Sequence, residues 1–260
     1  MTYKWMPGPT YLCRRHLILQ MVERIKPAGV LEIGFGGGDL IRILNEKGYG
    51  GVGVDFSEEA CSHIIEQHAG KELNFRIEAK PEAELEARGE KFGLVMAFEV
   101  LEHIDDDLGA LKRWHNLITD GGSLLISVPA HAKDYNDEDQ AAGHVRRYEK
   151  ADLEKKLTGA GFRIIKFYCY GYPLINLSRK IRMSFATGAG SPQDSMEKRS
   201  KNIGQGLVFW SLGKYLFNDI FMYPAYLVQR LFLGSDLGDG YLVLAEKTAG
   251  PKIAKQMTHA

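Results

Sequence analysis

The 260-residue sequence has little of what marks a secreted, membrane-spanning or nucleic-acid-binding protein. Its three cysteines, Cys13, Cys61 and Cys169, are odd in number and widely spaced, which favours reduced thiols over a disulfide framework. Its 33 Lys and Arg residues balance 33 Asp and Glu residues, so it lacks the cationic excess that grips a phosphate backbone. Residues 1–10 contain no apolar run of the kind found in signal peptides. We therefore expect a cytoplasmic protein with no nucleic-acid partner.

What is present is the composition of a globular chain, with 45% hydrophobic and 25% charged residues. Between residues 10 and 125, helical apolar spacing alternates with short runs rich in Val, Ile and Leu, which predicts an α/β doubly wound parallel sheet. Ser57 is expected to cap one of the helices. The predicted helices span residues 11–25, 40–47, 58–68, 107–117 and 152–161, and the predicted strands span 30–33, 51–54, 73–77, 92–97, 123–128, 162–170 and 241–246.

Residues 171–237 separate the last two predicted strands by far more than an ordinary connection and form a predicted, mostly helical insertion. The insertion holds eight basic and four acidic residues, a net charge of +4. Charged residues and a proline interrupt its apolar part before the roughly 20 apolar residues of a membrane span are reached. Its aromatic residues either form a packed subdomain or dimer face, or cover an apolar acceptor or contact a membrane surface: Phe209, Trp210, Tyr215, Phe217, Phe221, Tyr223 and Tyr226. Residues 1–170 and 238–248 form the main domain, and 249–260 are expected to be a flexible tail.

The most informative segment is a glycine-rich loop at residues 34–38, which follows a predicted strand and opens a predicted helix. A dinucleotide-binding loop would carry a small residue where Asp39 stands, and Glu32 would oppose a pyrophosphate. An acid at Glu32 instead suits a ligand with a cationic amino or sulfonium group. Asp55, at the end of the next strand, is placed to accept hydrogen bonds from a ribose diol.

The loop with Glu32 and Asp55 resembles motif I and the acidic ribose loop of class I S-adenosylmethionine-dependent methyltransferases. Residues 92–104, which include an acid-Val-Leu-Glu-His segment, resemble the fourth strand of that family, and residues 117–129 resemble its fifth. The resemblance covers about the first half of the chain. It implies a Rossmann-like, doubly wound, seven-stranded sheet whose last strand is antiparallel, with the helical insertion between the last two strands.

The resemblance also implies the residues that hold S-adenosylmethionine. Glu78 could instead be a solvated surface acid, and Asp55 could be a turn or capping acid. By resemblance, the methionine part is lined by Glu32, Gly34, Gly36 and Gly38, the ribose by Asp55, the adenine by Phe56, Glu78 and Ala79, and the methyl group by Phe98 and Glu99.

A hydroxyl acceptor requires a base for its proton, and a histidine is the usual group. His103 follows the fourth strand, although it could equally brace the next helix. The segment Gly-His-x-Arg-Arg-Tyr at residues 143–148 resembles a subgroup associated with glycan and natural-product pathways, which often has a histidine where this chain has Glu138. We expect His144 to be the base, Asp139 to hold its tautomer and Arg147 to orient the acceptor. The alternative is that Arg146 and Arg147 pin the loop by salt bridges.

Four residues of this region have metal-ligand side chains, namely His131, Asp137, Asp139 and His144, but their spacing matches no compact ligand motif, and we expect no metal. The sequence therefore predicts an S-adenosylmethionine-dependent methyltransferase acting on a small-molecule hydroxyl in a sugar, lipid-linked or natural-product acceptor. The alternatives are a non-catalytic S-adenosylmethionine-binding protein whose insertion engages a membrane or protein partner, and a methyltransferase acting on RNA or protein. A peripheral membrane contact and a homodimer are compatible with the insertion.

Overall fold

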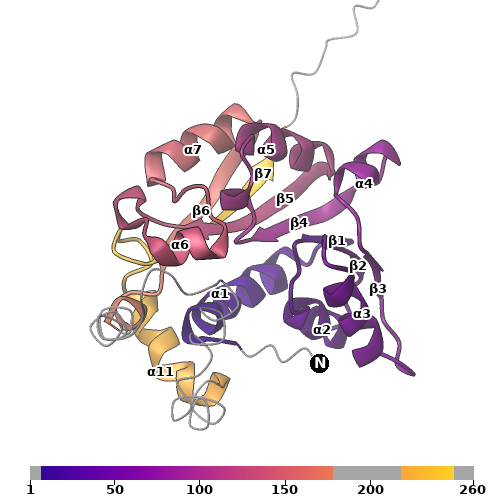
Figure 1. The fold of residues 1–260 in the computed structure, drawn as a ribbon, viewed down its shortest axis with the longest axis horizontal. Helices are drawn as coiled ribbons and strands as arrows, with labels where there is room; N and C mark the ends of the chain where they lie inside the picture. The colour runs from indigo at the N-terminus through magenta and orange to yellow at the C-terminus, as the bar shows by residue number, and fades with distance from the viewer. Residues whose placement is uncertain (1–6, 178–217, 249–260) are drawn as a thin grey trace, which may run out of the picture.

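The computed structural model describes residues 7–177 and 218–248, which fold around one seven-stranded sheet (Figure 1). The strand order is β3-β2-β1-β4-β5-β7-β6. The first five strands are parallel, and β7 lies antiparallel between β5 and β6, so the predicted sheet with its antiparallel last strand is confirmed. The strands are β1 (Val30–Ile33), β2 (Gly51–Val54), β3 (Phe75–Glu78), β4 (Phe92–Phe98), β5 (Ile118–Pro129), β6 (Phe162–Tyr170) and β7 (Gly240–Lys247).

Helices cover both faces of the sheet, with α4, α5 and α7 on one face and α1, α2 and α3 on the other (Figure 1). Each layer of helices packs against one face of the sheet and encloses its own apolar core. Trp114 of α5 is fully buried in the first core, and Ile18 of α1 is fully buried in the second. The helices are α1 (Pro9–Ile25), α2 (Asp39–Glu46), α3 (Glu58–Gln67), α4 (Ala83–Ala87), α5 (Asp107–Asn116), α6 (Asp137–Ala142), α7 (Lys150–Gly159) and α11 (Asp219–Arg230), with 3-10 turns η1 (Leu101–His103) and η2 (Ala132–Asp134).

The local signals in the sequence explain most element boundaries. The Ser57 hydroxyl accepts a hydrogen bond from the Ala60 amide at 3.1 Å, so the predicted cap of α3 is confirmed. Two predicted strand boundaries are wrong: β3 covers Phe75–Glu78, and β5 begins at Ile118, before the glycine pair. The chain remains paired there because the register between β4 and β5 shifts, with Gly121 at φ 75°. The short helices α4 and α6 were not predicted from the sequence.

Of the predicted insertion, the described part includes α11, which packs beside α1 (Figure 1). Leu12 and Cys13 of α1 form a small buried cluster with Met222 and Tyr226 of α11. Phe209, Trp210, Tyr215 and Phe217 lie outside the described residues, as does the predicted tail at 249–260. A separate helical unit at 171–237 therefore stays a prediction. Within 7–177 and 218–248, no helix combines the length and apolar character that crossing a membrane requires.

Candidate active site

A cavity of about 160 Å³ lies at the carboxyl ends of β1 and β4, where open α/β sheets place their ligands. The glycine loop forms one wall, and Glu32 projects from β1. Tyr11 and Arg14 of α1, Asp39 and Leu40 of α2 and Phe98 of β4 also line it. The structure therefore brings the predicted Glu32, glycine loop and Phe98 together around one space.

Backbone conformation explains the glycines of this loop. Gly34, Gly36 and Gly38 have φ values of 69°, 52° and 72°, in the left-handed region that side chains disfavour. At Gly34, a Cβ atom would also lie 2.6 Å from Val100 Cγ2, and at Gly38 it would collide with Ile64. At Gly36, a Cβ atom would meet nothing within 4 Å. Gly34 and Gly38 thus serve packing, whereas the open side of Gly36 leaves its backbone accessible to a ligand.

Glu32 is the most informative acid in the cavity. Its side chain is buried, and within the described residues its Oε2 atom has no hydrogen-bond partner. Burial, followed by the negative charge of Asp39, raises the pKa of Glu32 to about 8, although Arg14 acts in the opposite direction. An ionised carboxylate in this position is costly unless a cationic group accompanies it. The cavity therefore favours a ligand with a positive charge next to Glu32.

Glu99, predicted to border the methyl group, lies at the same edge and is held by α1. Arg14 Nη1 lies 2.5 Å from Glu99 Oε1, and the Ser127 hydroxyl donates to the same oxygen at 2.7 Å. The Tyr170 hydroxyl is 3.3 Å from it. Arg14 and Tyr170 were not predicted from the sequence. The sequence did carry a signal for Arg14, because Arg14 and Arg15 interrupt an otherwise apolar helix face. The structure shows that both are buried.

Asp55 lies at the end of β2 and supports the glycine loop. Its carboxylate accepts hydrogen bonds from the Gly36 and Ser57 amides, each at 2.9 Å. Asp55 therefore does act as a turn-stabilising acid, which was the alternative to ribose binding. It does not compete with the ribose assignment, because a carboxylate has further lone pairs. The ribose contact of Asp55 stays a prediction.

The predicted adenine residues differ in their surroundings. The Phe56 side chain is 80% exposed, and Ala79 is exposed as well. Glu78 is bound by Arg76 Nε at 2.5 Å and by Arg88 Nη2 at 2.7 Å. Burial acts to raise the pKa of Glu78, but hydrogen bonds from the two arginines outweigh it and lower that pKa. An adenine contact of Glu78 stays a prediction, since its carboxylate already has two cationic partners.

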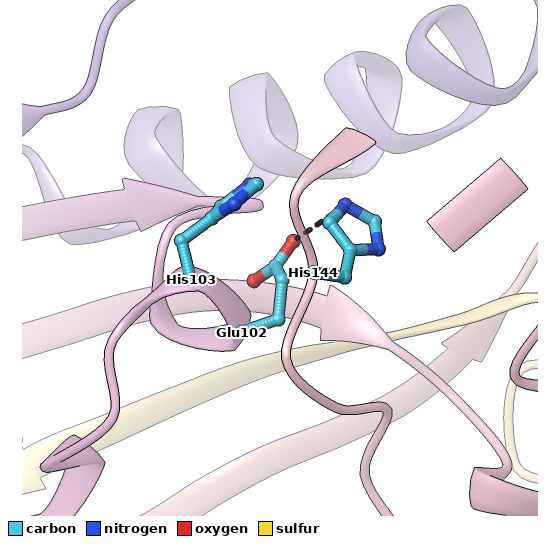
Figure 2. Close-up of side chains that lie close together, drawn as sticks. All are labelled: Glu102, His103 and His144. Carbon is cyan, nitrogen blue, oxygen red and sulfur yellow. Dashed lines mark ion pairs between the residues drawn. The ribbon is translucent and has the colours of Figure 1, made fainter. Parts of the chain in front are cut away.

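A second cluster joins η1, directly after β4, to the loop after α6 (Figure 2). The rings of His103 and His144 meet edge to face with centroids 4.9 Å apart. Glu102 lies between them, fully buried, with its Oε1 atom 3.8 Å from His144 Nε2. Burial and the negative charge of Glu99 hold the pKa of Glu102 well above its usual range. Glu102 was not predicted, although it belongs to the same acid-Val-Leu-Glu-His segment as His103.

Asp139 contacts His144 as the sequence predicted, with its Oδ1 atom 2.9 Å from His144 Nδ1. Asp139 is also the third residue of α6, where it forms a capping box with Asn136. Burial would raise the pKa of Asp139, but hydrogen bonds from Arg147 and His144 outweigh it and keep the pKa below its usual value. Asp139 therefore stays ionised at neutral pH and fixes the proton of His144 on Nδ1.

The two arginines of this loop are engaged by protein carboxylates. Arg147 Nε donates to Asp139 at 2.8 Å, and Arg146 Nη1 donates to Asp107 at 2.7 Å. The Arg147 side chain is only 8% exposed. This geometry is what loop pinning requires, and a contact of Arg147 with an acceptor stays a prediction. His131, considered above as a metal ligand, lies apart from His144, with its Nε2 atom against the Gly238 carbonyl at 3.1 Å.

Comparison with known proteins bears on the family and the fold. Residues 8–166 match the family described as a methyltransferase domain, which is more than half of the chain. The ubiquinone biosynthesis O-methyltransferase of Pseudomonas aeruginosa (strain LESB58) is 34% identical over 111 residues, covering 41% of this chain and 47% of that protein. Its counterpart in Pseudomonas entomophila (strain L48) is 29% identical over 110 residues, with the same two coverages. The chain thus spans about half the length of the curated relatives that it matches.

Solved structures show the same fold. An S-adenosylmethionine-dependent methyltransferase from Mesorhizobium loti has a TM-score of 0.58 at 14% identity, covering 92% of this chain and all of that one. The N-methyltransferase NodS from Bradyrhizobium japonicum WM9, in complex with S-adenosyl-L-homocysteine, has a TM-score of 0.53 at 18% identity and covers 65% and 83% of the two chains. At these identities, the likeness concerns the fold.

Proposed function

The chain belongs to the methyltransferase-domain family, and from that membership we propose that it transfers a methyl group from S-adenosylmethionine to a hydroxyl group of a small molecule. The observation that carries the cofactor proposal is the buried Glu32 carboxyl group in the glycine-lined cavity, with an oxygen that has no partner among the described residues. The ammonium and sulfonium charges of S-adenosylmethionine suit that carboxylate. The pyrophosphate of a dinucleotide would instead face Glu32 and Asp39 with like charge.

S-Adenosylmethionine supplies a methyl group already activated on a sulfonium, so the protein mainly aligns the two reactants. Glu32, Gly34, Gly36 and Gly38 hold the methionine part, and Phe98 and Glu99 lie toward the methyl group. Asp55 binds the ribose, while Phe56, Glu78 and Ala79 border the adenine. This assignment is supported by the shared cavity of Glu32, the glycines and Phe98.

The hydroxyl of the acceptor must lose a proton, and His144 is the proposed base. Its Nδ1–H group donates to Asp139, so the lone pair is on Nε2, which faces the cluster of Glu102 and His103. The ionised Asp139 would stabilise the imidazolium that forms when Nε2 takes the proton. Arg147 positions Asp139 through the hydrogen bond at 2.8 Å. His103 packs against His144 with its ring edge to face.

The acceptor class is a hydroxylated small molecule, in a sugar, lipid-linked or natural-product compound. The matched relatives are named as O-methyltransferases, which supports oxygen as the accepting atom. The name of those relatives also refers to the biosynthesis of ubiquinone, which supports testing acceptors with an apolar portion. Protein and RNA acceptors remain the alternatives, and the balanced charge of the chain gives RNA little support.

The outer face of α11 supports a peripheral membrane contact. Ile220 is 84% exposed, and Phe221 is 61% exposed. Leu231, directly after the helix, is 80% exposed. Apolar side chains on one helix, within an insertion of net charge +4, suit an anionic membrane surface. Co-sedimentation with anionic and neutral vesicles tests this contact, and a homodimer through the same face would instead appear as a concentration-dependent mass.

The first experiment is a melting-temperature scan with S-adenosylmethionine, S-adenosylhomocysteine and NAD. Ligand at 100 times its dissociation constant adds about 2.7 kcal/mol of stability, which such a scan resolves. We expect both sulfur nucleotides, and not NAD, to raise the melting temperature. Formation of S-adenosylhomocysteine is then measured with a panel of hydroxylated apolar compounds and sugars. Stabilisation by NAD alone would refute the cofactor assignment, and binding without turnover across the panel would favour the non-catalytic alternative.

A further inference from the structure

We propose that Glu102, His103 and His144 form a binding site for a divalent transition-metal cation, for which zinc is the best-suited ion. The binding site itself stands on the geometry of these side chains. Its part in methyl transfer rests on the proposed function.

The three side chains converge although two different segments supply them (Figure 2). Glu102 and His103 come from η1, and His144 comes from the loop that ends α6. One ligand atom from each residue lies within 4.8 Å of the other two. Atoms at this separation can close on a single ion with small side-chain rotations, since zinc takes its ligands at about 2.0–2.2 Å.

Glu102 supplies an independent indication that this cluster binds a cation. The side chain has no exposed surface, and both carboxylate oxygens lack a hydrogen-bond partner among the described residues. Buried carboxylates are normally paired or bound to a metal, because an isolated buried charge is costly. Glu102 instead faces two imidazole rings, which are metal ligands in their neutral form. A cation between these groups would neutralise the carboxylate and use the imidazoles as ligands.

The hydrogen bonds that the two rings make place the proton of each neutral ring on Nδ1. His103 Nδ1 lies 3.0 Å from the Gly143 carbonyl oxygen, which can only accept, so Nδ1 carries the proton. His144 Nδ1 donates to Asp139. Both rings therefore keep the lone pair on Nε2. A histidine that donates its other N–H group to a carbonyl or carboxylate is the usual arrangement behind a metal ligand.

A second group in the described part of the chain, His131, Cys169 and Asp236, also has its ligand atoms close together. In that group, each side chain already has a partner. His131 Nε2 contacts the Gly238 carbonyl, the Gly238 amide donates to Cys169 Sγ, and the Tyr241 hydroxyl donates to Asp236. The contrast supports Glu102, His103 and His144 as the metal site, because the carboxylate of Glu102 has no hydrogen-bond partner among the described residues.

Two histidines and one carboxylate form the ligand set of catalytic zinc sites that keep a further position open, and they also suit iron(II). An acceptor hydroxyl in that open position would lose its proton more readily, because a bound cation lowers the pKa of its ligands. The O–H bond breaks and the proton passes to solvent. The oxygen then bonds to the methyl carbon, and the electron pair of the C–S bond stays on sulfur. In the ion-bound protein, Nε2 of His144 would be a metal ligand and could not accept a proton. His144 would act as the base only in the protein without the ion.

The test is zinc binding by the full chain after dialysis against a chelator. We expect one zinc per chain by metal analysis and a saturable calorimetric titration. The variants His103→Ala and His144→Ala should each abolish stoichiometric binding, and His103, being exposed, can be replaced with little risk to folding. The control His63→Ala, in α3 on the opposite face of the sheet, should bind zinc like the unchanged protein.

The variant Asp139→Asn tests whether the hydrogen bond from His144 to Asp139 supports metal binding. Loss of such a supporting hydrogen bond commonly weakens metal binding by about 10–100-fold, whereas Glu138→Gln, an exposed neighbour on α6, should have no effect. No zinc binding, or equal binding by His103→Ala and His63→Ala, would overturn the proposed metal site. Melting temperatures with and without S-adenosylmethionine verify that each variant is folded.

Zinc titration requires neither cofactor nor acceptor, so the two proposals can fail separately. Zinc bound at this site without methyl transfer to any acceptor would leave the site standing and count against the proposed function. Methyl transfer that is unchanged after complete chelation would leave the function standing and overturn the part of the ion in it.

Discussion

Glu32 couples the stability of the cofactor-free protein to pH. Its pKa rises from 4.5 to about 8 on burial, so the folded state binds more protons than the unfolded state between these values. The unfolding free energy should therefore decrease as pH rises from about 5 to 8. Each pKa unit corresponds to about 1.4 kcal/mol. Chemical denaturation at several pH values measures this decrease.

The matched variant is Glu32→Gln, which cannot ionise. It should lose much of the decrease between pH 5 and 8, be the more stable protein at pH 8, and bind S-adenosylmethionine more weakly at every pH. An unchanged pH profile in this variant would show that Glu32 does not titrate there.

Asp55 and His144 should separate cofactor binding from turnover. Asp55→Ala removes the proposed ribose contact and the two hydrogen bonds that hold the glycine loop, so the dissociation constant for S-adenosylmethionine should rise. His144→Ala should leave that constant unchanged and reduce turnover by about 10²–10⁴-fold, the usual contribution of a general base. Calorimetric titration and the formation of S-adenosylhomocysteine give the two quantities. Unchanged affinity in Asp55→Ala would refute the ribose assignment.

The site residues that could be predicted from the sequence are those whose chemistry depends on near neighbours. Glu32 and the glycines belong to one strand-to-loop segment, and Asp139 lies five residues from His144, which it contacts. Arg14 contacts Glu99 from another element. Glu102 is a candidate site residue only because it is buried beside two histidines. No spacing in the sequence specifies either contact, because both are made by the packing of distant segments.

At the scale of elements, the turn from the glycine loop into α2 depends on Gly38. Gly38 adopts φ 72° at the N-cap of α2, and a Cβ atom there would collide with Ile64 of α3. Gly38→Ala should therefore lower the melting temperature and weaken cofactor binding, through both backbone strain of about 1–2 kcal/mol and the collision. Gly48→Ala is the matched control, because Gly48 also has a positive φ, of 81°, but open space around it. Equal losses in the two variants would attribute the effect to backbone strain alone.

The sheet could be predicted because most strands contain a short apolar run, and five of the seven strands begin within one residue of their predicted start. The exceptions are β3, which begins two residues late, and β5, which begins before a glycine pair at an irregular register with β4 that local propensity does not indicate. The helix α6 is short and largely acidic, so it has no apolar stripe. Its capping box with Asn136 and Asp139 was the available signal.

At the scale of the whole molecule, Arg15 ties three helices together. Its guanidinium in α1 contacts Asp39 of α2 and Asp219 of α11, each at 2.6 Å. The Arg15 side chain is 8% exposed, and Asp39 is 11% exposed. Arg15→Met should lower the unfolding free energy by about 1–3 kcal/mol, because it removes a hydrogen-bond donor from a mostly buried carboxylate. Thermal and chemical denaturation measure the loss.

Arg42→Met is the control, since Arg42 binds the same Asp39 from a side chain that is 40% exposed. Its loss should be under about 1 kcal/mol, in the range of surface ion pairs. A larger loss in Arg42→Met than in Arg15→Met would contradict the structural role assigned to Arg15.

The contacts of Arg15 also have a consequence for how two parts of the molecule influence each other. Asp39 begins the helix next to the cofactor loop, and Asp219 begins the helix that offers the exposed apolar face. One planar guanidinium therefore joins the helix beside the glycine loop to the helix with the exposed apolar face. If a ligand bound at α11 strengthens nucleotide binding, a bound nucleotide must strengthen binding at α11 by the same free energy. Through this link, binding at the exposed face of α11 and binding at the glycine loop would be energetically coupled.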